Sequence, residues 1–314
     1  MARNFPFSYS EYLSAGTLQK LPGELNVSIG TAPEVLLILR LLSGSIKLNH
    51  IKSRCSFIQT DNYFISDLKG YGQHWRKKFP MLIGDDYSAE NLALYIKRNK
   101  FKNRVFYKNI LSEISYFLYY QKNGNHSVAF IFLYRLLENI SYAFPLTYVS
   151  KTDDFKRTYT FLKEIMNGNK DSGELGFFKS FVTKLFHDTP IVESSIDLFI
   201  NVDTEEEQEH IYKLLKNLCT TSMLSDRSVQ PRILSIKYIE FGSFIITLRN
   251  RFFHYMNGGA QNIESSEISD IDLLFSIINK QSLHWVSSIL LEIISHNITE
   301  FHQAHDIVRV EQEQ

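Results

Sequence analysis

The chain has 314 residues, of which 44% are hydrophobic and 22% are charged, and its formal net charge at pH 7 is zero. This composition is typical of a globular protein with a sizeable core, and it excludes a global positive field that would attract nucleic acid or an anionic membrane. Any site for a polyanion must therefore be a local patch. Glycine and proline are sparse, at 14 and 7 residues, which favours long helices over many short strands.

No pattern in the sequence indicates export, membrane insertion or a cofactor. The N-terminal residues MARNFPFSYSEYL lack the charged start, apolar run and cleavage site of a secretion signal. No segment approaches the roughly 18 uncharged apolar residues of a membrane-spanning helix. Cys55 and Cys219 are far apart and have no CxxC partner, so neither a disulfide framework nor a cysteine-based zinc site is expected. We expect a cytoplasmic protein with no membrane association, no metal and no cofactor.

Residues 1–95 are expected to form a mixed or irregular N-terminal region with an accessory or sensing role. An alternating piece at 25–29 is compatible with an edge strand, and an apolar run at 34–42, just after a proline, has the length of a helix. Fragments at 55–58 and 63–65 are compatible with strands or with short helices.

Residues 96–305 are expected to form an α-helical bundle, followed by a polar tail at 306–314. Apolar periodicity and the breakers between segments predict helices at about 88–122, 126–142, 153–166, 174–186, 204–218 and 271–302. The segment 126–142 is apolar on most sides and should be a central, largely buried helix. The expected fold class is therefore mostly α, with a helical bundle preceded by a smaller mixed region.

The stretch 245–259, IITLRNRFFHYMNGG, carries Arg249, Asn250 and His254 on a strongly apolar segment. Apolar residues upstream, from position 233 to 252, recur at threes and fours, which predicts one helix that begins after Gln230-Pro231 and ends at the glycine pair 258–259. In such a helix Asn250 and His254 lie one turn apart on one face, while Arg249 must reach round to join them.

Arg-x4-His with a polar residue after the arginine resembles the signature of the HEPN superfamily, helical domains of prokaryotic defence and toxin systems and of some eukaryotic RNases. The resemblance covers the C-terminal two thirds of the chain, and only the motif is specific. It implies a HEPN-like bundle and a metal-independent endoribonuclease of a bacterial toxin or antiphage defence system. Its partners would be RNA, a second copy in a homodimer with a composite cleft, and an antitoxin or another defence subunit.

By that resemblance His254 is the general base or acid, Arg249 the clamp on the phosphate and transition state, and Asn250 the orienting group. The residue chemistry agrees, because histidine titrates near neutral pH and the planar guanidinium matches phosphate oxygens. The alternative is a non-catalytic helical interaction or scaffold subunit of a multi-protein defence complex. In that case Arg249 and Arg251 are solvated cations at the negative end of a helix.

Two further groups of residues carry predictions. Tyr134, Arg135 and Glu138 interrupt the apolar segment 126–142, either as a local salt bridge or as polar residues that steer Arg249 or His254. A basic and aromatic stretch at 97–108, KRNKFKNRVFYK, is either a solvated helix face or a grip for RNA. A shorter cluster of the same kind lies at 71–78, YGQHWRKK. The predicted RNA-binding cations are Lys97, Arg98, Lys100, Lys102, Arg104 and Arg251.

Overall fold

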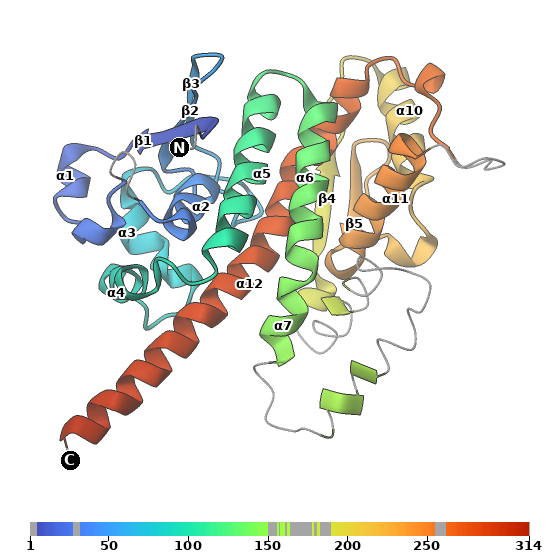
Figure 1. The fold of residues 1–314 in the computed structure, drawn as a ribbon. Coiled ribbons are helices and arrows are strands. Elements are labelled where there is room, and N and C mark those ends of the chain that lie inside the picture. The colour runs from blue at the N-terminus through green and yellow to red at the C-terminus, as the bar shows by residue number, and fades with distance from the viewer. Residues whose placement is uncertain are drawn as a thin grey trace. The chain divides into compact units, whose positions relative to one another are not determined.

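The computed structural model describes residues 5–27, 32–149, 190–254 and 262–313, with short pieces at 156, 158–160, 162–163, 178 and 181–182. In this part of the chain the structure is mostly helical, with two small antiparallel sheets (Figure 1), which confirms the predicted mostly α class. The chain divides into two compact units. The first unit comprises Met1–Tyr119 and Ser287–Gln314, and the second comprises Tyr120–Val286.

The first unit combines a three-stranded sheet with short helices. Its elements are β1 (Phe7–Glu11), α1 (Ala15–Leu18), η1 (Gly23–Leu25), α2 (Glu34–Leu42), β2 (Ile46–His50), β3 (Cys55–Gln59), η2 (Gly72–His74), α3 (Trp75–Lys78), η3 (Pro80–Leu82), α4 (Ala89–Asn99), most of α5 (Arg104–Lys122) and the last part of α12 (Ile271–Glu313). The sheet has the order β1-β2-β3, and both pairs of strands are antiparallel. The expected boundary at residue 95 falls inside α4.

Local patterns in the N-terminal region predicted some of these elements and missed others. The run at 34–42 is helix α2, and the fragment at 55–58 lies in strand β3, as predicted. The strand predicted at 25–29 is wrong in its described part, because Leu25 ends the 3-10 helix η1. Residues 63–65 lie in turns. Leu25, Tyr63 and Phe64 are buried without belonging to a strand, so their apolar character reflects packing and not pairing.

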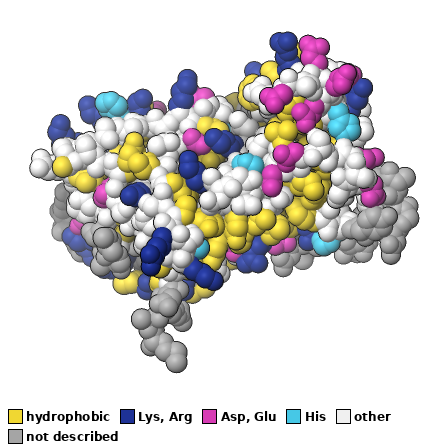
Figure 2. Space-filling view, turned by 90° about the horizontal axis from the view of Figure 1, so that it is seen from above, with side chains coloured by type: hydrophobic (Ala, Val, Ile, Leu, Met, Phe, Trp, Pro, Cys, Tyr) yellow, Lys and Arg dark blue, Asp and Glu magenta, His cyan; other side chains and the backbone are white. Residues whose placement is uncertain are grey.

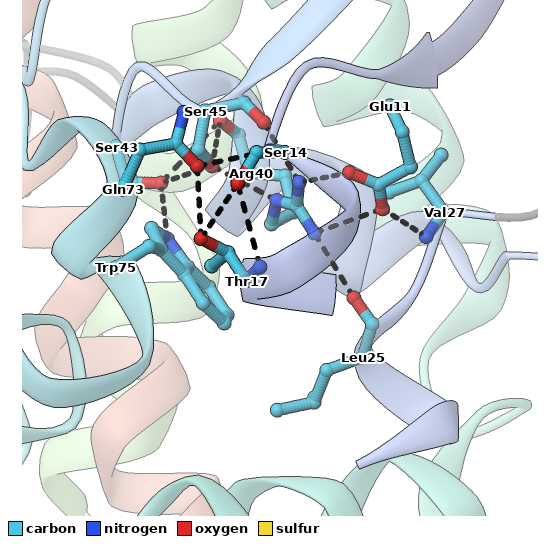
Figure 3. Close-up of polar contacts among 10 residues, drawn as sticks. All are labelled: Glu11, Ser14, Thr17, Leu25, Val27, Arg40, Ser43, Ser45, Gln73 and Trp75. Carbon is cyan, nitrogen blue, oxygen red and sulfur yellow. Dashed lines mark hydrogen bonds and ion pairs between the residues drawn. The ribbon is translucent and has the colours of Figure 1, made fainter. Parts of the chain in front are cut away.

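Arg40 anchors the first unit from inside its core (Figure 3). Its side chain has no exposed surface, and its guanidinium forms a two-pronged ion pair with Glu11 of β1, at 3.1 and 2.6 Å. The remaining donors bind Ser45 Oγ, Ser45 O and Leu25 O at 2.8–3.0 Å. Burial lowers the pKa of Arg40, and Glu11 opposes this shift by its hydrogen bond and its charge. The buried charge is therefore satisfied at every N–H.

Trp75 completes this cluster. Its ring stacks beneath the guanidinium carbon of Arg40 at 5.1 Å, and its Nε1 donates to Ser43 Oγ at 2.7 Å. The ring is fully buried. The ring therefore cannot stack on a base of RNA, although the basic and aromatic cluster at 71–78 had suggested this contact.

Two helix starts follow directly from the sequence. Ser88 Oγ accepts a hydrogen bond from Asn91 N at 3.2 Å, and Asn91 Oδ1 accepts one from Ser88 N at 3.1 Å, which closes a capping box at the start of α4. Thr204 Oγ1 accepts from Glu207 N at 3.2 Å at the start of α10. Both caps satisfy backbone donors that a helix start leaves unpaired, and both were predicted.

The second unit holds the predicted motif. Its elements are the end of α5, α6 (His126–Ser141), α7 (Ala143–Val149), η4 (Pro190–Glu193), β4 (Ser195–Phe199), α10 (Glu205–Lys216), η5 (Thr221–Met223), β5 (Ile233–Lys237), η6 (Tyr238–Glu240), α11 (Phe241–Phe253), η7 (Ser265–Glu267) and the first part of α12. The helices predicted at 153–166 and 174–186 lie almost entirely outside the described residues.

The motif helix is shorter than predicted at both ends. Ile233, Leu234 and Ile236, assigned to it by their spacing, belong instead to strand β5, which pairs antiparallel with β4. The helix begins at Phe241 and ends at Phe253, before His254, and the glycine pair expected to end it lies outside the described residues. Backbone pairing with a strand almost forty residues away overrides the local periodicity here.

The last helix is longer than predicted. Helix α12 runs from Ile271 to Glu313, so the described part of the expected polar tail, 306–313, continues the helix. Its residues up to 286 belong to the second unit and those from 287 to the first. Among the described residues, no helix has both the length and the apolar character needed to cross a membrane.

Helix α11 packs on α12 through a glycine, and this contact yields a test of the packing. A Cβ at Gly242 would lie 2.8 Å from Cη2 of Trp285, whose ring is fully buried and whose Nε1 donates to Tyr238 O at 2.9 Å. We expect Gly242→Ala to destabilise the protein by about 1–3 kcal/mol, because the ring cannot retreat without straining that bond. Urea unfolding measures the effect.

The matched control is Gly16→Ala in helix α1, where a Cβ would meet nothing within 4 Å. Alanine is favoured over glycine in a helix, so this variant should be at least as stable as the wild type. A Gly242→Ala protein with unchanged stability would show that Trp285 has room to shift.

Candidate active site

Arg249 is held on two sides by residues of helices α11 and α6. Its Nη1 donates a hydrogen bond to Oδ1 of the adjacent Asn250 at 3.0 Å, and its guanidinium carbon lies 4.7 Å from the centre of the Tyr134 ring. Tyr134 belongs to α6 and is 7% exposed, whereas Arg249 and Asn250 are partly exposed. A cation over an aromatic face contributes about 0.5–2 kcal/mol, so these contacts restrict the orientation of the guanidinium.

Two charged side chains act on the pKa of Tyr134: Arg249 of the motif and Glu138 of α6. Burial raises the pKa of Tyr134, the positive charge of Arg249 lowers it, the negative charge of Glu138 raises it, and the net change is an increase. The phenol therefore stays neutral at physiological pH. Tyr134 offers Arg249 a ring face, and Glu138 acts on this pair through its charge.

Helix α6 has one solvent-facing stripe, although its sequence suggested a helix apolar on most sides. Ile131, Arg135, Glu138 and Tyr142 are all exposed and follow one another at helical spacing. Arg135 and Glu138 are thus solvated, which removes the desolvation cost that made them look costly in the sequence. Tyr134, next to the stripe, contacts Arg249 of the motif.

His254 is the first residue beyond helix α11. Its backbone is extended, with φ −115° and ψ 104°, and its side chain is exposed. The prediction that the helix continues through His254 is wrong for this reason. The end of the helix is fixed by its aromatic residues, since Phe253 stacks on Phe130 at 5.9 Å and Phe252 packs on Phe275 at 5.0 Å. An exposed imidazole thus follows a firmly packed helix end.

Arg251 points away from Arg249, because two positions along a helix correspond to about 200°. Its Nη1 donates to Asn217 O at 2.8 Å, at the C-terminal end of α10, where a cation is favoured by the helix dipole. Arg249 and Arg251 therefore serve different faces of α11. The first faces α6 and the second faces α10.

A pocket of about 540 Å³ lies beside Arg251, and the sequence did not single out its other residues. Helix α10 contributes His210 and Lys213, and the chain that returns after the motif contributes Asn262 and Glu267. These residues come from separate segments and follow no motif, so only the folded chain brings them together. Of the residues predicted to bind RNA, Arg251 is the one that lines this pocket.

The other predicted RNA-binding cations lie in the first unit, at the turn between α4 and α5. Lys97 pairs with Glu24 at 3.5 Å and Arg104 with Glu34 at 3.0 Å. Phe101 is 66% exposed, and Lys100 and Arg104 lie 5.2 and 5.6 Å from its ring centre. An exposed ring flanked by cations is an arrangement on which a base can stack.

Arg98, near the end of α4, and Lys102, in the turn that follows, are exposed as well. On the face of the described residues that Figure 2 shows, lysine and arginine side chains are scattered among acidic, hydrophobic and other side chains. This distribution agrees with the net charge of zero. Contacts with RNA would thus depend on small local groups of cations.

Comparisons with known proteins give no information about this site. No family model, no curated protein and no solved structure matched the chain. Among the described residues, no three His, Cys, Asp or Glu side chains lie close enough together to hold a metal ion. The chemistry of this candidate site therefore follows from the arrangement of Arg249, Asn250, Tyr134 and His254.

Proposed function

We propose that the chain is a metal-independent endoribonuclease of a bacterial toxin or antiphage defence system, with its active site at the end of helix α11. The observation that carries the proposal is the guanidinium of Arg249, oriented by Asn250 and by the Tyr134 ring, on the helix that ends just before the exposed His254. A restrained cation and an accessible imidazole on one short segment are two of the groups that this reaction requires.

The reaction is an internal transfer at phosphorus. A base removes the proton from a ribose 2′-OH, the 2′ oxygen attacks the adjacent phosphorus, and the 5′ oxygen leaves with a proton from an acid. The products are a 2′,3′-cyclic phosphate and a 5′-OH end. His254 serves as base or acid, since imidazole changes protonation state near neutral pH. Arg249 donates to the phosphate oxygens, where negative charge increases in the transition state.

The proposal includes a homodimer. One proton must be removed and another supplied, and the motif contributes a single histidine per chain. A second copy facing the first across a two-fold axis supplies the second imidazole, which agrees with the composite cleft that the HEPN resemblance implies. In this proposal the helices around the motif form a HEPN-like bundle, and an antitoxin or another defence subunit restrains it.

The test is cleavage of total cellular RNA by the purified full chain in EDTA. We expect the wild type to leave 2′,3′-cyclic phosphate ends, and His254→Ala and Arg249→Ala to lose about 10²-fold or more in rate. His305→Ala and Arg227→Ala are the matched controls, because both side chains are exposed and lie outside the motif and the predicted RNA-binding stretches. Equal rates for His254→Ala and wild type would contradict the proposal.

An inactive wild type calls for a second measurement, because an activator can be missing in vitro. Growth of bacteria that express wild type or His254→Ala then decides. Growth arrest by the wild type alone supports the nuclease. Equal growth with both, together with no cleavage, favours a non-catalytic interaction subunit.

A further inference from the structure

The pocket beside Arg251 has the size and the lining of a ligand site. Its volume of about 540 Å³ lies within the range of small-molecule pockets in proteins. It is formed within the second unit by α10, the last turn of α11 and the segment 262–267. It lies on the face of α11 that carries Arg251, whereas Arg249 faces α6, so a role for it does not depend on catalysis.

Hydrogen bonds between its walls preform the pocket. His210 Nε2 lies 2.6 Å from Glu267 O, so α10 is tied to helix η7. Arg251 Nη1 donates to Asn217 O at 2.8 Å, and Ile263 N donates to Arg251 O at 3.0 Å. Each of the three segments is thus bonded to at least one other. A ligand would therefore meet walls that are already in place, which lowers the entropy cost of binding.

The hydrogen bond between His210 Nε2 and Glu267 O also defines which ring nitrogen of His210 carries a proton. A carbonyl oxygen only accepts hydrogen bonds, so Nε2 must carry the proton that it donates to Glu267 O. Nδ1 is then an acceptor in the neutral ring and a donor in the cation. His210 can therefore bind either a hydroxyl group or a phosphate oxygen.

Besides His210, the lining contains four chemical kinds of side chain. Lys213 and Arg251 are cations that suit a phosphate, and the apolar side chains Leu214, Leu218 and Ile263 suit the face of a base. The amides of Asn217 and Asn262 can pair with base edges, and the Glu267 carboxylate accepts from a hydroxyl or an amino group. Lys213 also pairs with Glu209 at 2.9 Å, but both side chains are about half exposed, and such a pair contributes little.

We propose that this pocket binds a nucleoside monophosphate, either free or as the end of an RNA chain. The phosphate lies at Lys213 and Arg251, and the base packs on the wall of Leu214, Leu218 and Ile263. A single phosphate group is favoured over a longer polyphosphate, because the lining has two permanent cations and one carboxylate, Glu267.

Calorimetric titration of the full chain in EDTA tests this proposal with AMP, GMP, CMP and UMP, the four matching nucleosides and inorganic phosphate. We expect at least one nucleotide to bind about tenfold or more tightly than its nucleoside and than phosphate alone, because each part contributes contacts. Lys213→Gln should weaken nucleotide binding by about tenfold, since a charged hydrogen bond is lost. Because the Lys213 side chain is exposed, this variant should fold like the wild type.

Lys216→Gln is the matched control, because Lys216 lies on the same helix with the same charge, is exposed, and is not part of the pocket lining. His254→Ala should bind nucleotide like the wild type, so the pocket and the nuclease can fail independently. A 5′-phosphorylated dinucleotide that binds more tightly than the mononucleotide assigns the pocket to an RNA end, and the reverse order assigns it to a free nucleotide. No nucleotide binding by the wild type, binding of phosphate alone with equal affinity, or equal weakening by Lys216→Gln would overturn the proposal.

Discussion

Replacing Arg249 with lysine is expected to slow RNA cleavage by about 10²-fold or more while the protein remains folded. Lysine keeps the positive charge but has no planar fork, so it cannot bond Asn250 and a phosphate with the geometry of a guanidinium. It also stacks less well on the Tyr134 ring. The loss should appear in the single-turnover rate, because the interaction strengthens as charge develops on the phosphate.

Two substitutions at Tyr134 separate the ring from its hydroxyl. Tyr134→Phe keeps the aromatic face beneath Arg249 and should cleave at nearly the wild-type rate. Tyr134→Leu removes that face and should lower the cleavage rate roughly two- to thirtyfold, the equivalent of about 0.5–2 kcal/mol of a cation–aromatic contact. Unchanged single-turnover rates in both Arg249→Lys and Tyr134→Leu would show that the guanidinium of Arg249 has a structural role and does not act on the phosphate.

Replacing Arg40 with alanine is expected to destabilise the first unit by about 3–5 kcal/mol, because it leaves the largely buried carboxylate of Glu11 without its partner. The side chain of Glu11 is 19% exposed, and the carbonyls of Leu25 and Ser45 lose donors at the same time. Urea unfolding of the full chain, followed by a probe of the first unit such as Trp75 fluorescence, measures the change.

The matched control for this ion pair is Arg76→Ala, because Arg76 pairs with Glu90 on the surface and both side chains are more than a third exposed. Exposed pairs contribute at most about 1 kcal/mol, so this variant should be close to the wild type. The double variant Glu11→Leu/Arg40→Met should recover part of the loss, since an apolar pair carries no buried charge. Recovery stays partial because Glu11 Oε1 also accepts a hydrogen bond from Val27 N, at 2.5 Å. Equal stability of Arg40→Ala and Arg76→Ala would contradict this account.

Elements whose signals are local could be predicted from the sequence. The apolar run of α2 and the caps Ser88 and Thr204 occupy their expected places, because each depends on residues within a few positions. Strand β5 could not be recognised in the same way. Its residues repeat with a spacing that also suits a helix, and only pairing with β4 decides between the two.

The candidate site shows the same division. Arg249 and Asn250 are neighbours in sequence, so their contact needed no knowledge of the fold. The stacking of Arg249 on Tyr134 depends on the packing of α6 against α11, and the sequence named Tyr134 as a polar neighbour of the motif without indicating that its ring face makes the contact. The end of the helix at Phe253 was missed because apolar spacing does not mark where a helix stops, and the glycine pair at 258–259 was expected to end it.

Helix α12 has a consequence for the order in which the protein folds during synthesis. The first unit takes residues from both ends of the described chain, and its core includes Ile289, Leu290 and Ile293 of the last helix. Domains usually fold in the order in which the ribosome delivers them. Here the N-terminal residues of the first unit must wait for α12, whereas the continuous second unit can complete its core earlier. The Arg40 cluster thus belongs to the unit that is completed after the other.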